Sequence, residues 1–313
     1  VDVIDAPQWK HDPFGGEIVD GRIYGRGTSD MKGSDCAMIT AAARYAEKTG
    51  KDFAGKICVS CTVHEECFEG VSSREITRLA KPDFVIIGEA TTTTVKRGQR
   101  GRAEVVVETE GVSCHSSNPE KGVNAVYEMM AVIEEIRKIV PNEHPLLGKG
   151  ILELTDIISK PYPGASVVPS LCRATFDRRT LVGQDEGVIL RQGNEAIARG
   201  LKARCYLAEG EEKCWTGETI RAKRYFPAWV VDEDSELVQG AMKGLKDAGI
   251  EAKLSHFAFC TNGSSFCGEA GIPCIGYGPS LESLAHVRDE YIEIDQLTKA
   301  CKGFECILAQ LTK

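Results

Sequence analysis

Hydrophobic and polar residues alternate along this 313-residue chain in stretches that predict helices and strands in turn. Residues 34–51 place apolar side chains at the 3.6-residue spacing of a helix, which we expect to end at Gly50. The runs "KICVSCTV" (56–63) and "DFVIIGE" (83–89) are continuous apolar stretches, which favour strands buried on both faces. Such β-α-β units predict an α/β fold with a mainly parallel sheet.

The pattern changes at about residue 98. Two strand-like runs and two amphipathic helices follow, at 102–111, 172–180, 122–140 and 185–203. Two helices on an antiparallel sheet make a small α+β module. After "RYFPAW" the first pattern returns, with a helix over 235–249. We therefore predict an α/β domain made of residues 1–97 and 226–313, interrupted by an inserted α+β domain at 98–225.

Composition narrows the classes of function. The formal net charge of −8 argues against nucleic acid and anionic membrane as partners. No apolar run approaches the roughly 18 residues of a membrane-spanning helix. Thirteen cysteines at irregular spacings are typical of reduced thiols in a cytoplasmic protein. Cys58 and Cys61 have C-x-x-C spacing, but strand positions three apart point to opposite faces, which predicts buried strand cysteines rather than a chelating pair.

The stretch "RIYGRGTSDMKG" (22–33) places Asp30 among Gly25, Gly27 and Gly33. Glycine permits sharp turns and close approach of a ligand, so a phosphate cradle is one hypothesis. Neither a G-x-x-x-x-G-K-[ST] loop nor a complete G-x-G-x-x-G is present, and an anion site would not favour a carboxylate. A lone Asp near glycines is ordinarily a turn former. A cation site requires further ligands elsewhere in the chain.

Those further ligands follow the predicted strands. Glu65 and Glu66 come directly after 56–63, Glu89 ends 83–89, and His286 follows a glycine-rich loop. Each alone has an ordinary explanation, a solvated surface for the glutamates and a structural hydrogen bond for the histidine. Together with Asp30, however, the carboxylates would repel one another without a cation. We therefore predict two divalent metal ions, most simply zinc, with cobalt and manganese as alternatives.

These residues lie in motifs that resemble a known family. "GRIYGRGTSDMKG", the "EE" pair, "GEAT", "GVSCHSSNPEKGVNA" and the late "AH" followed by "EY" are similar to the M20 family of metallopeptidases and amidohydrolases. That family includes aminoacylase, acetylornithine and succinyl-diaminopimelate deacylases, and carboxypeptidase G2. The motifs stand in the family's order across nearly the whole chain. The segments "VHEE" and "KRGQRGRAE" resemble its branch of selenium-metabolism-linked hydrolases.

The resemblance implies a role for each candidate residue of the first domain. Asp30 would bridge two metal ions. Glu66 and His286 would complete one metal site, and Glu89 would belong to the other. Glu65 would be the general base that deprotonates the bridging water. The residues 1–97 and 226–313 would then form a di-metal hydrolase domain.

One metal ligand of the family stands outside the given sequence. The family carries an H-x-D motif, and Asp2 in "VDV" fits its Asp, which orients the ligand His. That His would precede Val1, so we expect the sequence to be truncated at its N-terminus.

The resemblance also implies residues that contact the substrate. His115 would reach across a homodimer to the partner's active site, which makes 98–225 a lid and dimerisation domain. Arg179, in the family's D-x-R motif, would bind the substrate carboxylate. Asn262 and Gly263 lie where the family has a glycine-rich substrate loop. Ser166 replaces the Asn of the family's N-x-x-P motif, which leaves that substrate contact open.

The predicted function is hydrolysis of an amide or peptide bond in a small, carboxylate-bearing substrate by a homodimeric enzyme. We expect the dimer to use an exposed edge strand, "EVVVETEG" (104–111), and the helix at 122–140. Other hypotheses stay open. A nucleotide-binding or redox enzyme lacks a complete fingerprint. A non-catalytic dimeric binding protein would not need Glu65 beside Glu66, although an inactive fragment without its first His ligand is a related alternative.

Overall fold

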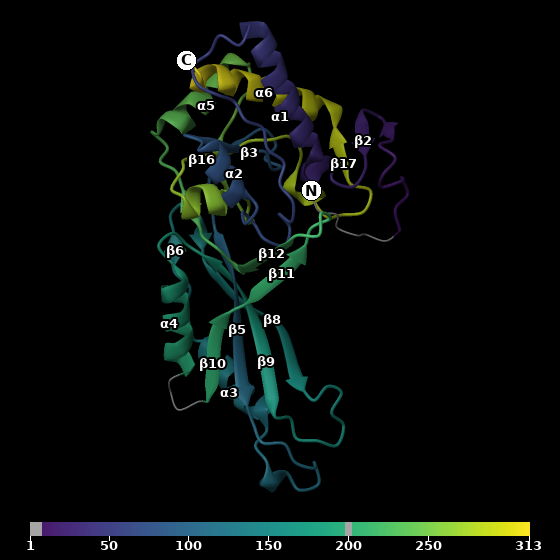
Figure 1. Cartoon of the computed structure of the whole chain (residues 1–313), viewed down its shortest axis with the longest axis vertical. Coiled ribbons are helices and arrows are strands. Elements are labelled where there is room, and N and C mark those ends of the chain that lie inside the picture. Colours follow the sequence, from purple (N-terminus) through teal and green to yellow (C-terminus); the bar gives the residue numbers. More distant parts are fainter. Residues whose placement is uncertain (1–7, 198–201) are drawn as a thin grey trace. The chain divides into compact units, whose positions relative to one another are not determined.

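The structure is a computed structural model that describes residues 8–197 and 202–313. The chain divides into two compact units. Unit 1 consists of Val1–Gln99 and Trp229–Lys313, and unit 2 of Arg100–Ala228. We describe each unit by itself; Figure 1 labels their elements.

Unit 1 contains the helices α1 (Gly33–Thr49), α2 (Ser73–Ala80), α5 (Glu236–Asp247) and α6 (Ile294–Leu311). Its short helical turns are η1 (Thr28–Lys32), η3 (Ser264–Glu269) and η4 (Glu282–Leu284). Its strands are β1 (Ile18–Val19), β2 (Arg22–Tyr24), β3 (Val85–Ile87), β4 (Val95–Gln99), β14 (Trp229–Val230), β15 (Leu254–Phe257), β16 (Cys274–Gly276) and β17 (Tyr291–Glu293). Helix α1 ends at Gly50, as the sequence predicted, because that residue adopts the left-handed conformation of a helix terminus.

The larger sheet of unit 1 is mixed. Its order is β14-β4-β16-β3, and β15 also pairs with β4. The pairs β15/β4 and β16/β3 are parallel, whereas β14/β4 and β16/β4 are antiparallel. The sheet is therefore mixed, rather than mainly parallel as the sequence predicted. Strand β4 follows β3 after only residues 88–94, which leaves no room for the crossover that a parallel strand requires. Strand β4 therefore runs opposite to β3 and lies beyond β16, which separates the two in the sheet.

Helices α1, α5 and α6 of unit 1 pack side by side against this sheet (Figure 1). The core contains fully buried side chains from the strands and helices, among them Leu245, Ile275 and Ile307. Tyr277 and Phe304 meet edge to face with ring centroids 4.9 Å apart, which joins α6 to the end of β16. Among the described residues, none of the helices combines the length and the apolar character needed to cross a bilayer.

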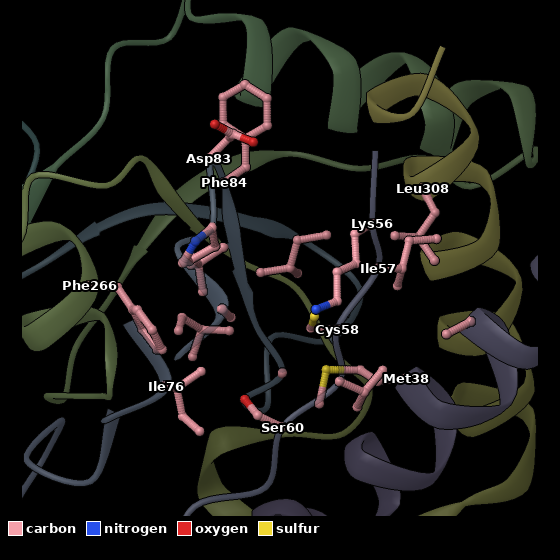
Figure 2. Close-up of a pocket in the computed structure, with 18 of the residues that line it drawn as sticks. Met38, Lys56, Ile57, Cys58, Ser60, Ile76, Asp83, Phe84, Phe266 and Leu308 are labelled. Carbon is pink, nitrogen blue, oxygen red and sulfur yellow. The ribbon is translucent and has the colours of Figure 1, made fainter. Parts of the chain in front are cut away.

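Residues 56–63 pair with no strand in the part of the chain that the structure describes, so the predicted buried strand is wrong. Cys58 and Cys61 are exposed rather than buried. An apolar run becomes a strand only where a neighbour accepts its backbone hydrogen bonds. Here the run instead lines a cavity of about 750 Å³. Figure 2 shows Ile57 and Cys58 facing side chains of α1, α2, η3 and α6, namely Met38, Ile76, Phe266 and Leu308.

Unit 2 contains helices α3 (Ala125–Ile136) and α4 (Glu186–Ile197) and the turn η2 (Pro119–Lys121). Its strands are β5 (Gly101–Glu110), β6 (Glu143–His144), β7 (Gly148–Lys149), β8 (Ile151–Lys160), β9 (Leu171–Thr180), β10 (Ala203–Leu207), β11 (Glu209–Lys213), β12 (Thr219–Lys223) and β13 (Tyr225–Phe226). Asn124 caps α3, because its side chain accepts a hydrogen bond from the Val126 amide at 2.9 Å.

The main sheet of unit 2 is antiparallel, in the order β10-β5-β9-β8, with β13 also paired to β5. Helices α3 and α4 pack on it through a core that includes Val105, Val107 and Phe176. The predicted edge strand "EVVVETEG" belongs to β5, which is central, so that prediction is wrong. The apolar residues of β5 are buried because the strand lies between β10 and β9. The outer strands are β8 and β10, and β8 exposes Ile157 and Ile158.

Candidate metal centre

Asp30 lies in the turn that joins β2 to α1. Gly27 has φ 81°, in the left-handed region that favours glycine. The Lys32 amide donates to the Gly27 carbonyl at 2.7 Å, and Thr28 Oγ1 donates to the Gly25 carbonyl at 2.8 Å. The peptide bond between Asp30 and Met31 is cis. The glycines of this stretch therefore shape a tight turn that carries a partly buried carboxylate.

Three of the predicted metal ligands of unit 1 converge on one point. His286 Nε2 lies 3.0 Å from Asp30 Oδ2 and 3.0 Å from Glu66 Oε2. The three residues come from η1, from the turn after residues 56–63 and from the loop after η4. His286 itself has a positive φ of 61°, uncommon for a histidine. Ligand atoms of all three side chains lie within 4.8 Å of one another, close enough to share an ion.

The two other predicted glutamates lie beside this group. Glu89 is buried, and Glu65 Oε1 is a buried oxygen without a hydrogen-bond partner among the described residues. Burial, followed by the charges of Glu89 and Glu66, raises the pKa of Glu65 well above its ordinary value. Burial and the Asp30 charge likewise raise the pKa of Glu89. Neighbouring carboxylates this deeply desolvated require positive charge or protons.

A divalent cation fits the donor set of this centre. Two carboxylates and one imidazole around a single point are a typical zinc environment. A cavity of about 50 Å³ is lined by Asp30, Glu65, Glu66 and Glu89, and one water needs only ~10–15 Å³. Glu65, whose Oε1 has no hydrogen-bond partner among the described residues, lines this space, which suits an ion or a reacting water. The residues present therefore fit a bound metal.

Asn262, a predicted substrate residue, lines the same cavity. Its Nδ2 donates to Thr62 Oγ1 at 3.0 Å, while its Oδ1 is buried without a partner among the described residues. Gly263 follows, and a Cβ there would lie 2.5 Å from Nε1 of the buried Trp229. Close packing against Trp229 therefore requires glycine at 263.

Two predicted residues belong to unit 2. His115 is exposed, and its Nδ1 accepts a hydrogen bond from the Ser117 amide at 3.1 Å, so the neutral ring carries its proton on Nε2. Arg179 on β9 donates to Asp177 Oδ2 at 3.1 Å, on the same face of the strand. The remaining predicted residue, Asp2, lies outside the described residues.

Comparison with known proteins decides the family. The family described as "Peptidase family M20/M25/M40" matches residues 1–310. The chain belongs to the M20/M25/M40 peptidase family. Members of this family are metal-dependent hydrolases, which agrees with the donor set described above.

Individual members of the M20 family resemble the chain along most of its length. The chain is 32% identical over 296 residues to the uncharacterized protein YgeY of Escherichia coli K12, covering 93% of this chain and 73% of YgeY. It is 28% identical to a succinyl-diaminopimelate desuccinylase of Dechloromonas aromatica, covering 97% and 79%. The M20 metallo-carboxypeptidase Sso-CP2 of Sulfolobus solfataricus has the same fold, with TM-score 0.70, 18% identity and coverage of 98% and 82%.

Two residues of this M20 chain escaped the sequence prediction. Asp35 lines the small cavity, and burial raises the pKa of its carboxyl. An acidic residue in the first turn of a helix is ordinarily explained by the helix dipole, so the sequence alone gave no reason to assign Asp35 to the site. Glu290 contacts the turn that carries Asp30. In the sequence, Glu290 stood out only as the Glu of the "EY" pair that follows His286.

Metal should stabilise this M20 chain in a pH-dependent way. Without metal, the raised pKa values of Glu65 and Glu89 favour protonated carboxyls in the folded state. That stability is fully present below their ordinary pKa of 4.5 and falls as pH rises towards the folded values. Zinc at about 100 times its Kd should add about 2.7 kcal/mol to the free energy of unfolding. The increase in Tm on adding zinc should be larger near pH 7.5 than near pH 5.5. Calorimetry that finds equal Tm shifts at both pH values would contradict this expectation.

Proposed function

We propose that this M20 hydrolase cleaves an amide or peptide bond in a small substrate that carries a carboxylate next to that bond. The observation that carries the proposal is that Asp30, Glu66 and His286 meet beside Glu65 Oε1, a buried oxygen that has no hydrogen-bond partner in the described part of the chain. A set of metal ligands alone would serve binding, whereas a set with a further carboxylate beside it also supplies a general base.

Two divalent ions, most simply zinc, would be held by Asp30, Glu66, Glu89 and His286. When bound, such ions lower the pKa of a water and polarise a carbonyl. Glu65 then performs the proton transfers. It takes one proton from the water that attacks the carbonyl carbon, and it returns that proton to the nitrogen as the C–N bond breaks. The products are a carboxylic acid and an amine.

Polar groups outside the metal centre would orient the substrate. Asn262 Oδ1 is a buried acceptor without a partner among the described residues, which suits an amide N–H of the substrate. Arg179 would pair with the substrate carboxylate through its planar fork of donors. His115 carries an exposed Nε2–H that could stabilise the developing oxyanion.

Unit 1 would be the catalytic domain and unit 2 a lid that forms a homodimer. Unit 2 exposes apolar side chains on the outer strand β8 and on α3, among them Ile157, Ile158, Tyr127 and Met130. An edge strand without Pro and with exposed isoleucines favours pairing with another strand. In such a two-fold dimer we expect His115 of one subunit to act in the active site of the other.

Elemental analysis and a substrate panel together test the proposal. We expect the protein to contain up to two divalent ions per chain. We also expect hydrolysis of N-succinyl or N-acetyl amino acids or of dipeptides, and a chelator should abolish it. A matched panel carries a carboxamide in place of the carboxylate of each substrate. The rate of hydrolysis should fall on this panel, because a carboxamide cannot form the ion pair with Arg179. A metal-loaded protein that is inert on the whole panel would refute the proposal.

A further inference from the structure

Glu290 is a completely buried carboxylate that holds the turn carrying Asp30. Its Oε2 accepts hydrogen bonds from Arg26 Nη1 at 2.6 Å and from the Gly27 amide at 2.9 Å. Its Oε1 accepts from the Ser29 amide at 2.8 Å and from the Asp30 amide at 3.0 Å. One side chain thus binds four donors within five consecutive residues.

The backbone next to Glu290 strengthens this attachment. Strand β17 pairs with β2, and the Gly25 amide donates to the Glu290 carbonyl at 2.9 Å. Ser29 Oγ donates to the Tyr291 carbonyl at 2.6 Å. The pairing of β2 with β17 therefore fixes the position of the start of the turn. The hydrogen bonds of the Glu290 side chain fix the backbone conformation from there to Asp30.

A buried Arg–Glu pair is by itself only a structural feature. Arg26 is nearly buried and its guanidinium lies 5.0 Å from the Trp9 ring, so Glu290 does serve as its counterion. That role needs one contact. The other three donors of Glu290 are amides of the turn, and the last of them belongs to Asp30 itself.

We propose that Glu290 is a positioning residue that fixes the 26–30 turn so that the Asp30 carboxylate meets His286 and Glu66 before any metal binds. The inference rests on the proposed function, because it assigns Asp30 to the metal. A carboxylate suits the task, since its two oxygens can accept from all four donors at once. Glutamine has one acceptor oxygen, so two of the donors would face an N–H group instead.

The test is zinc affinity, measured by competition with a chromophoric chelator on folded protein, with Tm followed separately. We expect E290Q to bind zinc about tenfold more weakly. The double variant R26M/E290Q removes both buried charges, so it folds without an unpaired guanidinium and keeps the net charge of the pair. It should recover Tm but not zinc affinity. The matched control is E293Q on β17, because the ion pairs of the described residues give Glu293 a single partner, the half-exposed Arg22 at 3.7 Å. It should bind zinc like the wild type.

Two results for zinc affinity would overturn the positioning role. Wild-type affinity in R26M/E290Q would mean that Glu290 acts only as the counterion of Arg26. Wild-type zinc affinity in both E290Q and R26M/E290Q would mean that the turn keeps its conformation without the hydrogen bonds of Glu290. If E290Q does not fold, the double variant decides alone. A wild-type protein that binds no zinc or other divalent ion would overturn the proposed function as well, which the metal measurement on the wild type identifies directly.

Discussion

Replacing Glu65 by glutamine should abolish turnover while the bound metal stays. Removal of a general base typically costs 10²–10⁴ in rate, so we expect kcat to fall by about 10³. Metal content should be unchanged, because Glu65 Oε1 has no hydrogen-bond partner among the described residues and lies beside the ligand group rather than within it. Steady-state kinetics and elemental analysis of the same preparation measure the two effects.

Glu66 provides the matched variant, since it is the same residue type one position along. Its Oε2 lies 3.0 Å from His286 Nε2, so Glu66→Gln should lose metal from one site. Equal metal loss in both variants would show that the roles of the pair are assigned wrongly. A second readout needs no activity. Because burial and nearby charges raise the pKa of Glu65, Glu65→Gln should raise the Tm of the metal-free protein near pH 7.5.

Mixing two inactive variants should restore activity if the site is shared across a dimer. His115→Ala lacks the proposed oxyanion donor, and Glu65→Gln lacks the proposed base. After subunit exchange, half of the dimers are heterodimers. In each of them one site pairs an intact Glu65 with an intact His115, so the recovery should approach about a quarter of wild-type activity.

Two controls make the mixing experiment decisive. Subunit exchange is demonstrated first with differently tagged chains, and the variants are also assayed together without exchange. Absence of recovery despite exchange would mean that His115 acts within its own chain or not at all. The exposed Nε2–H of His115 and the apolar surface of β8 and α3 motivate the experiment.

The candidate centre was predictable because its chemistry restricts residue types. Asp30, Glu66 and His286 lie in sequence motifs that resemble those of the M20 family, and the structure brings them together from three separate segments. Glu290 was not predictable in this way. Its partners are mainly backbone amides, which any sequence supplies, so only the fold reveals that a glutamate 260 residues away from Asp30 binds that turn.

The sequence by itself determined local structure and family. The glycine at 50 ends α1 and the asparagine at 124 caps α3, since such effects depend on a few neighbouring residues. The tertiary structure decided which strands are neighbours. Strand β5 is central although its sequence suited an edge, β4 reverses direction, and residues 56–63 pair with no described strand. Strand pairing joins segments far apart in the chain, so an apolar run specifies that it will be buried without specifying its partner.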